Sequence, residues 1–255
     1  MSKRFGPTDD AGTSALRLTG NALANTVIGN AGNNVLDGGA GVDVMAGGAG
    51  NDRFMIDNAA DQIVEAAGGG GDTALTCVSY TLGVGVSVEA IRAANAASTS
   101  AFDLTGNEYA QTLSGNAGVN VLNGGGGNDY ILGYEGGDTL IGGLGADNLV
   151  GGVGDDMFRY FSTAESTAAA SDRIFDFAAG DHIALSGIDA VFDTGANDAF
   201  AFIGATAFSG LAGELRAFDN GNGSWTVQAD VDRNHIADFQ LLVTPASRDQ
   251  IVAKI

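Results

Sequence analysis

A unit of nine residues recurs along this chain and limits the folds that are open to it. Residues 38–52 read GGAGVDVMAGGAGND, in which two glycines, a third glycine and an aspartate occur twice at a spacing of nine residues. The same register gives units at 20–28, 29–37, 38–46 and 47–55, then at 106–114, 115–123, 124–132, 133–141, 142–150 and 151–159. A short fixed period is the signature of a solenoid, in which each repeat packs on its neighbours.

Two columns of the repeat hold over all ten units. Position eight is always large and apolar: Val27, Leu36, Met45, Phe54, Leu113, Leu122, Ile131, Leu140, Leu149 and Phe158. Position six is always an amide or a carboxylate: Asn25, Asn34, Asp43, Asp52, Gln111, Asn120, Asp129, Asp138, Asp147 and Asp156. The last three residues of each unit are typical of a short strand with one buried face, and the glycine-rich remainder permits tight turns with positive φ.

Strands and turns in alternation predict an all-β fold: a right-handed parallel β-roll in two arrays, followed by a β-rich C-terminal domain. Two nonapeptides would form one coil, so that each unit lies against the unit two positions later, with strands about 4.8 Å apart. The position-eight side chains would fill a thin interior. A glycine-rich disordered linker is the alternative, but a linker has no interior for an unbroken apolar column to fill.

A longer repeat suggests how the chain is divided. LTGNALANTVIGNAGNNVLDGG (18–39) aligns without a gap with LTGNEYAQTLSGNAGVNVLNGG (104–125), and Thr13-Ser14-Ala15 aligns with Thr99-Ser100-Ala101. Residues 1–19 are therefore expected to be the tail of a preceding module, and the chain a piece of something longer. The expected order is then a first array at 20–56, a spacer at 57–103, a second array at 104–160 and a C-terminal domain at 161–255.

The spacer is expected to continue the roll as irregular β structure. Alternating β-branched and aromatic residues predict strands at 78–82 and 84–91. Cys77 is the only cysteine, which excludes an internal disulfide. It abuts a predicted strand and is expected to be a small buried apolar residue.

The charge balance narrows the range of partners. Asp and Glu number 31 against 11 Lys and Arg, a net charge of −20. Nucleic-acid binding and anionic membrane surfaces both require a basic face, so they are disfavoured. Cations are favoured as partners, although solubility alone would also explain an acidic surface. The sequence has no apolar run long enough for a transmembrane helix, and MSKRFGPTDDAG lacks the apolar stretch of a secretory signal peptide.

Stacked position-six side chains predict a metal site. Two carboxylates a few ångströms apart are unfavourable without a counter-ion. Ca²⁺ accepts six to eight oxygen ligands, whereas Mg²⁺ needs stricter geometry and Zn²⁺ prefers His or Cys. We therefore expect several calcium ions, held by carboxylates and by carbonyls of the glycine turns. The candidate turn glycines are Gly124, Gly126, Gly142, Gly143, Gly145, Gly151, Gly152 and Gly154.

The pairs are expected to differ in strength. Asp129/Asp147 and Asp138/Asp156 join two carboxylates and should bind most tightly. Asn120/Asp138, Asn25/Asp43 and Asn34/Asp52 each contain a neutral amide and should bind more weakly. Units 20–28 and 106–114 lack both the second glycine and the aspartate, and are expected to serve mainly in packing.

The unit GGxGxDxUx, in which U is apolar, resembles the nonapeptide of the RTX (haemolysin-type) family, whose repeats form a calcium-binding parallel β-roll. FSTAESTAAASDRIFDFAAGDHIALSGID (161–189) and the segment 208–243 resemble the region that follows the roll in serralysin-type secreted metalloproteases. That resemblance implies a capping domain, with strands paired around the turn at 220–223, and an uncleaved type I secretion signal. The chain end from Asp249 is similar to the family's ending but has three extra residues.

The resemblance also implies further calcium ligands at Asp172, Asp176 and Asp181, although Ala184 stands where the family often has another Asp. Asp230, Asp232, Asn234 and Asp238 have the odd-position spacing of a calcium loop. His235 replaces the glycine that such a loop needs, so a plain acidic hairpin is expected there.

Catalytic motifs are missing from the sequence. His182 and His235 are its only histidines and lie 53 residues apart, so they cannot form the HExxH zinc motif. GxSxG and Walker motifs are missing as well. We therefore predict a non-catalytic, secreted module that folds on extracellular calcium and leaves a Gram-negative bacterium by leaderless type I export. One alternative is the export and folding tail of a larger enzyme, such as a serralysin-type protease. Another is a calcium-dependent adhesion or glycan-binding module with a cell-surface partner, in which an exposed Trp225 stacks on sugars.

Overall fold

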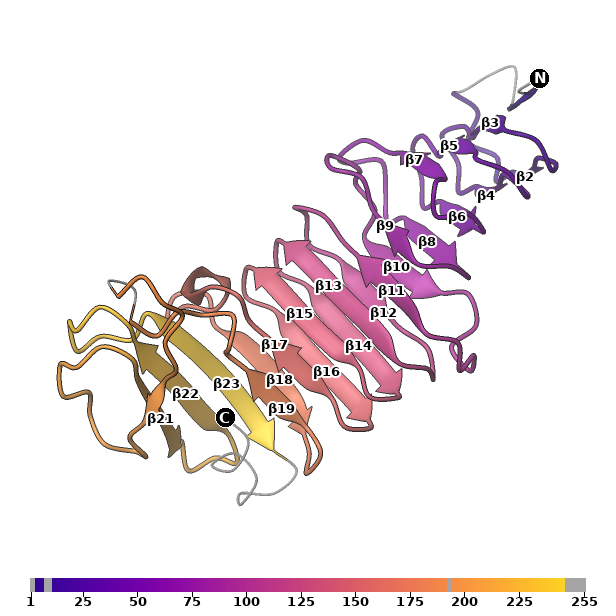
Figure 1. The fold of residues 1–255 in the computed structure, drawn as a ribbon. Coiled ribbons are helices and arrows are strands. Elements are labelled where there is room, and N and C mark those ends of the chain that lie inside the picture. Colours follow the sequence, from indigo (N-terminus) through magenta and orange to yellow (C-terminus); the bar gives the residue numbers. More distant parts are fainter. Residues whose placement is uncertain (1–2, 7–10, 192–193, 246–255) are drawn as a thin grey trace.

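The computed structural model describes residues 3–6, 11–191 and 194–245, and in it the strands stack into one elongated column (Figure 1). The coils begin near the N-terminal strands and end at the C-terminal strands β21 to β23 (Figure 1). Asp249 and the rest of the predicted secretion signal lie outside the described residues. In the part of the chain that the structure describes, no helix has the length and apolar character needed to cross a membrane.

The strands form three sheets. The first contains, in spatial order, β1 (Lys3–Phe5), β3 (Asn25–Ile28), β5 (Val44–Ala46) and β7 (Gln62–Val64). The second contains β19 (His182–Ala184), β17 (Met157–Arg159), β15 (Thr139–Leu144), β13 (Asn120–Gly126), β11 (Phe102–Thr105) and β9 (Tyr80–Thr81).

The third sheet runs the length of the molecule. It contains β2 (Arg17–Thr19), β4 (Val35–Asp37), β6 (Arg53–Ile56), β8 (Thr73–Thr76), β10 (Ala90–Ala93), β12 (Thr112–Ser114), β14 (Tyr130–Glu135), β16 (Asn148–Val153), β18 (Asp172–Phe177), β23 (Phe239–Pro245), β22 (Trp225–Asp230), β21 (Glu214–Asp219) and β20 (Ala201–Phe202). A 3₁₀ turn, η1, spans Thr163–Glu165.

Successive strands alternate between facing sheets, so two nonapeptides complete one coil. Leu122 of β13 lies opposite Leu140 of β15, and Ile131 of β14 lies opposite Leu149 of β16, each pair parallel and 18 residues apart. All ten position-eight side chains are completely buried. The all-β prediction, with a parallel β-roll as its main element, is confirmed. The roll forms because one inward side chain per short strand is enough to fill the space between two facing sheets.

Residues 57–103 continue the stack. β6 pairs with β8, β8 with β10 and β10 with β12, all parallel. The strand expected at 78–82 appears as β9, but the one expected at 84–91 is largely wrong. Residues 84–89 form a turn, a bend and irregular backbone, with Gly85 at a φ of +78°, and only the last two residues of that range enter β10. Cys77 is exposed, contrary to expectation, because Thr76 before it faces inward.

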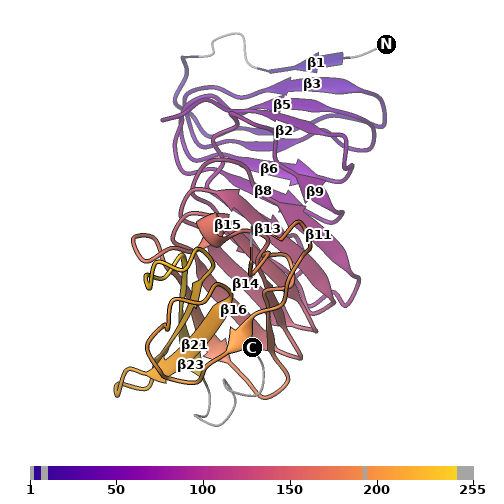
Figure 2. The ribbon, with the colours of Figure 1, turned by 60° about the vertical axis from the view of Figure 1, so that its left-hand side comes forward.

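The last strands close the column (Figure 2). β18 stacks on β16, β23 lies parallel to β18, and β22 and β21 complete an antiparallel meander. The expected pairing around 220–223 is confirmed by β21 and β22. Aromatic rings extend the core into this region: Phe158 lies 6.1 Å from Phe177 and Tyr160 lies 5.0 Å from Phe239, measured between ring centroids.

Candidate metal centre

Hydrogen bonds between successive coils form four ladders of position-six side chains. In each rung a backbone N–H donates to the carboxylate that stands one coil later, as from Asp129 N to Asp147 Oδ1 at 2.7 Å. The second-array ladders are Gln111–Asp129–Asp147–Asp172 and Asn120–Asp138–Asp156–Asp181. The first-array ladders are Asn25–Asp43–Asp61 and Asn34–Asp52–Asp72–Glu89.

Most of these aspartates have one oxygen left over. Oδ1 accepts the rung, while Oδ2 is buried without a hydrogen-bond partner in Asp43, Asp52, Asp72, Asp129, Asp138, Asp147, Asp156 and Asp172. A buried unpartnered carboxylate oxygen costs free energy, and native proteins rarely tolerate one without a water or an ion. Eight of them along the four ladders are therefore a strong indication of bound cations.

Burial changes how the ladder carboxylates titrate. Burial is the main cause that raises the pKa of Asp129 to about 7, where the hydrogen bond from the Gln111 backbone lowers it and the charge of Asp147 raises it. Burial likewise raises the pKa of Asp156 to about 7 and those of Asp138 and Asp147 to about 6. A cation would reverse these shifts, because it stabilises the charged form.

The first glycine of each full unit faces a group of oxygens. If Gly124 were replaced by a residue with a side chain, the new Cβ atom would lie 2.2 Å from Asp129 Oδ2 and 2.6 Å from the carbonyl oxygen of Gly142, one coil later. A Cβ at Gly133 would lie 2.3 Å from the Oδ2 of its own position-six aspartate and 2.3 Å from the carbonyl of Gly151. A carboxylate oxygen and a carbonyl oxygen from two coils thus lie beside the same glycine. Both are ligand types that Ca²⁺ prefers, so the chemistry of the residues present fits a hard divalent cation.

The other candidate glycines serve the close approach of two turns. Gly143, Gly145, Gly152 and Gly154 all have positive φ, and a Cβ at any of them would lie within 2.1 Å of a carbonyl oxygen of the preceding coil. Gly126 differs, because a Cβ there would meet nothing closer than 3.5 Å. These contacts explain why a turn of this shape needs glycine at positions two and four but not at position three.

The side-chain amide nitrogens of the ladder asparagines donate to oxygens of the turns. Asn25 Nδ2 donates to the carbonyl of Leu23 at 2.6 Å, and Asn34 Nδ2 donates to the carbonyl of Gly32. Asn120 Nδ2 donates to Asn116 Oδ1 at 3.1 Å. The predicted partners Asn25/Asp43, Asn34/Asp52 and Asn120/Asp138 are adjacent, but each amide nitrogen already satisfies turn oxygens that a carboxylate would leave to a cation.

The spacer supplies acidic residues that the repeat pattern does not reveal. Asp43 N donates to Asp61 Oδ1 at 2.9 Å, and Asp52 N donates to Asp72 Oδ1 at 2.7 Å. Both first-array aspartates therefore have a carboxylate neighbour as well as an amide one. Asp61 keeps the 18-residue offset and could have been found from it. Asp72 follows Asp52 by 20 residues because the intervening turn is longer, and the search for a fixed period misses it.

The three aspartates expected from the serralysin resemblance lie at the end of the second array. Asp172 and Asp181 form the last rungs, at 2.9 Å each. The Asp176 carboxylate accepts from the backbone N–H groups of Gly151 and Gly152, at 3.0 and 2.8 Å. All three therefore cap the final turns of the roll.

A separate acidic group lies in the loop after β22. The carboxylates of Asp230, Asp232 and Asp238 offer oxygens within 4.8 Å of one another. Asp230 accepts from the backbone N–H groups of Arg233 and His235, at 2.8 and 2.9 Å, both residues having positive φ. These hydrogen bonds stabilise the backbone of the loop itself.

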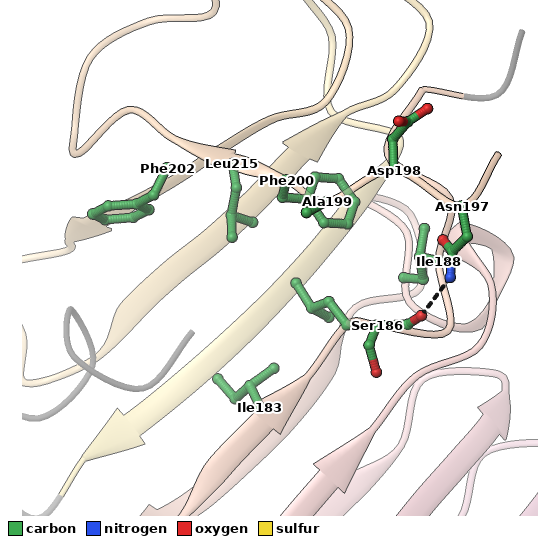
Figure 3. Close-up of a pocket in the computed structure, with 10 residues that line it drawn as sticks. Ile183, Ser186, Ile188, Asn197, Asp198, Ala199, Phe200, Phe202 and Leu215 are labelled. Carbon is green, nitrogen blue, oxygen red and sulfur yellow. Dashed lines mark hydrogen bonds between the residues drawn. The ribbon is translucent and has the colours of Figure 1, made fainter. Parts of the chain in front are cut away.

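The C-terminal region also contains a cavity of about 340 Å³ (Figure 3). Its wall is mainly apolar, and Asn197 Nδ2 donates to the carbonyl of Ser186 across one rim at 3.0 Å. Among the described residues, Asp198 is the one charged residue that lines it, and it accepts a hydrogen bond from Thr194 Oγ1. No ladder carboxylate lines this cavity, so it is separate from the candidate metal sites.

A comparison with known protein families identifies the same repeats whose position-six residues form the ladders. The sequence model of the RTX calcium-binding nonapeptide repeat matches in four copies, over residues 19–54, 105–140 and 132–159. No curated protein matches the chain. The match ends before the C-terminal region begins, so it does not extend to the serralysin-like segment. The model of the RTX calcium-binding repeat thus matches residues of both arrays, and Ca²⁺ is the ion that such repeats bind.

Proposed function

We propose that the chain is a secreted module that is largely unfolded without calcium and folds when its ladders bind extracellular Ca²⁺. The observation that carries this proposal is the set of eight buried, unpartnered Oδ2 atoms. The proposed carboxylate ligands are Asp43, Asp52, Asp129, Asp138, Asp147 and Asp156, with Asp172, Asp176 and Asp181 at the end of the second array. Carbonyls of turn glycines such as Gly142 and Gly151 would complete the coordination.

In this proposal, repulsion between negative charges opposes folding until calcium binds. At neutral pH in the absence of calcium, the net charge of −20 and the stacked carboxylates oppose folding. The ion binds only where two coils already lie together, so its binding free energy becomes folding free energy. At a free calcium concentration of 100 times Kd, one site would add about 2.7 kcal/mol to stability. Mg²⁺ should substitute poorly, because it needs a more regular site and retains water.

A circular dichroism titration tests the proposal. The calcium-free chain at pH 8 should lack most of its β signal and gain it cooperatively as Ca²⁺ is added. Equal concentrations of Mg²⁺ should produce little change. A full β signal in excess chelator that calcium leaves unchanged would show that folding does not depend on the ion.

We also propose leaderless type I export, with residues 161–255 as a serralysin-like capping and export domain. The support is the sequence resemblance, together with the position of β18 to β23 beyond the last coil. The proposed role is binding and folding rather than catalysis. In support, His182 and His235 each have Nδ1 against a backbone carbonyl, that of Gly180 and that of Phe208 respectively.

A second candidate, the folding and export tail of a larger enzyme, is favoured by a repeated contact. Asn30 Nδ2 donates to the carbonyl of Ser14 at 3.0 Å, and Asn116 Nδ2 donates to the carbonyl of Ser100 at 2.8 Å. Residues before the first array therefore have the same structural role as the end of the spacer, as they would if another module preceded them. An upstream coding sequence with an HExxH motif would decide for this candidate.

The glycan-binding alternative loses its main argument, because Trp225 is half-buried and packs on the core.

A further inference from the structure

The outer face of the third, longest sheet carries a row of basic side chains. The register of that sheet places Arg17 of β2, Arg53 of β6 and Arg173 of β18 in one line of cross-strand partners. Arg92 of β10 stands two residues beyond that line. All four side chains are exposed. None of their guanidinium groups forms an ion pair or a hydrogen bond in the part of the chain that the structure describes. We call Arg17, Arg53, Arg92 and Arg173 the arginine row.

The arginine row concentrates positive charge in a chain that has little of it. The sequence has 11 Lys and Arg against 31 Asp and Glu, so the row contains four of its 11 basic residues. The ladder aspartates are buried between the coils and do not face this surface. Asp37 of β4 does lie on the same face, and its carboxylate accepts from the backbone N–H of Gly39 at 3.1 Å. An unpaired guanidinium group fits a carboxylate of a partner, because its planar donors match the two carboxylate oxygens.

A surface hollow of about 290 Å³ adjoins the row at Arg53. Asn33 and Asn51 line this hollow, and the Oδ1 atom of each accepts a backbone N–H of the next coil at 2.8 Å. Their Nδ2 groups donate to no other described residue. Asp52 is also at the wall, but only 2% of it is exposed. The hollow therefore offers free amide and guanidinium donors and no exposed carboxylate.

A second hollow, of about 250 Å³, adjoins the row at Arg173. Phe175, which is 44% exposed, and Leu242 form an apolar part of its wall. Asn222 Oδ1 accepts from the backbone N–H and the hydroxyl of Ser224, at 3.1 and 2.7 Å, so the Nδ2 group is left for a ligand. A sugar ring has an apolar face of C–H groups and hydroxyls at its edge. An apolar surface beside polar donors suits such a ring, and the arginine adds a preference for an acidic sugar.

We propose that the arginine row binds a linear polysaccharide of uronic-acid sugars, with Arg53 and Arg173 each paired to a sugar carboxylate. Six strand spacings of about 4.8 Å separate β6 from β18, or about 29 Å, so one extended polymer can reach both hollows. A polymer held at two points binds more tightly than a fragment held at one. This surface lies outside the calcium sites and does not involve Trp225. It requires only that the coils are folded.

The shape of the row favours a linear polymer of low charge density over other anionic partners. The row is narrow and follows the long axis of the sheet, whereas a membrane would contact a broad face. Duplex nucleic acid carries one charge for about every 1.7 Å of its length. Four arginines cannot compensate that density in a chain whose net charge is −20. A polyuronate has one carboxylate for each sugar, and its hydroxyls match the free amide donors of the hollows.

The test measures how the full chain binds end-labelled galacturonate oligomers, by fluorescence anisotropy in saturating Ca²⁺ and low salt. R53Q and R173Q each remove one proposed carboxylate partner. R159Q removes the same charge from an exposed residue of β17 in the facing sheet. We expect R53Q and R173Q each to weaken the binding of an oligomer long enough to span both hollows by about tenfold or more. R159Q should match the wild type.

Three results would overturn the surface. One is an equal loss of affinity in all three variants, which would indicate attraction by general charge alone. Another is equal binding of an oligomer whose carboxyl groups have been reduced to alcohols. The third is tighter binding to phosphatidylglycerol vesicles than to the long oligomer, which would make the row a membrane contact.

A measurement on the wild type covers the case in which a variant does not fold. Exposed arginines react with p-hydroxyphenylglyoxal, and mass spectrometry gives the extent of modification at each one. The long oligomer should slow the modification of Arg53 and Arg173 and leave that of Arg159 unchanged. Equal modification with and without the oligomer would refute the surface. A chain that keeps its β signal in excess chelator, and whose Arg53 and Arg173 the oligomer still protects, would contradict calcium-dependent folding and support the surface.

Discussion

Each position-six aspartate divides its two oxygens between two tasks. Oδ1 accepts the N–H of the preceding coil, and Oδ2 has no hydrogen-bond partner and is the oxygen that we propose for the ion. Where Asn takes this position, as at Asn34, the amide nitrogen donates to turn carbonyls instead. Exchange of one oxygen for one nitrogen thus replaces an acceptor by a donor that bonds to the turn itself. We expect coils with Asn at this position to depend less on calcium than coils with Asp.

Tyr134 has a backbone conformation that is unfavourable for a residue with a side chain. It stands where the regular units have their second glycine and has a φ of 81°. A side chain in this region costs about 1–2 kcal/mol, partly offset by the roughly 0.5–1 kcal/mol of chain entropy that glycine loses on folding. We predict that Tyr134→Gly raises the unfolding free energy by about 0.5–1 kcal/mol in saturating Ca²⁺, as measured by urea denaturation.

Tyr130 provides the matched control. It is similarly exposed but lies in β14 with ordinary strand geometry, so Tyr130→Gly should lower the unfolding free energy by about 0.5–1 kcal/mol. Equal effects of the two substitutions would mean that the backbone at Tyr134 is not strained.

At the scale of the element, a strand of this roll contributes one large inward side chain. β15 shows the contrast within a single strand, because Leu140 is fully buried and Leu144 is 57% exposed. We predict that Leu140→Ala lowers the unfolding free energy in saturating Ca²⁺ by about 2–5 kcal/mol, since the thin interior offers little to fill the cavity. Leu144→Ala should stay within about 0.5 kcal/mol of the wild type. Comparable losses in both variants would show that the interior does not provide the main stability of the coil.

The elements divide clearly into those that the sequence reveals and those that it does not. The strands of the arrays follow from the position-eight column, because each apolar residue such as Leu122 sits at a fixed phase of the coil. The spacer keeps the same coil but breaks the period, and a two-residue extension of one turn moved Asp72 out of the expected register. Glu65 keeps the 18-residue offset from Gly47, but it stands where the repeat has glycine. Cys77 was mispredicted because a neighbouring strand pattern does not say which face a single residue takes. Contacts between coils depend on register, which a linear pattern fixes only while its period is constant.

At the scale of the whole molecule, buried carboxylates should make the calcium-free fold sensitive to pH. Burial raises the pKa values of Asp129, Asp156 and Glu65 to about 7. Between the unfolded pKa values near 4 and these folded values, the folded chain binds more protons than the unfolded one. The free energy of unfolding that these carboxyl groups contribute is therefore fully present below about pH 4. It is lost as the pH rises towards 7. We predict that the calcium-free chain has more β signal at pH 5 than at pH 8 in circular dichroism.

Bound calcium should reverse the direction in which the stability of the fold changes with pH. Bound ions favour the ionised carboxylates, so the calcium-saturated chain should lose stability on acidification from pH 8 to pH 5. A calcium-free chain that instead gains β signal between pH 5 and pH 8 would contradict the assignment of uncompensated buried carboxylates.

The ladder rungs also give the column a polarity. In every rung the N–H belongs to the earlier coil and the accepting side chain to the later one, from Asn25 and Asp43 at one end to Asp156 and Asp181 at the other. Backbone bonds run the other way at the same positions, because Asn148 N donates to the carbonyl of Asp129 at 2.8 Å and Met157 N donates to the carbonyl of Asp138 at 2.7 Å. Each coil therefore offers side-chain acceptors to the coil before it and carbonyl acceptors to the coil after it. A folded coil can thus accept a new coil at either of its two ends.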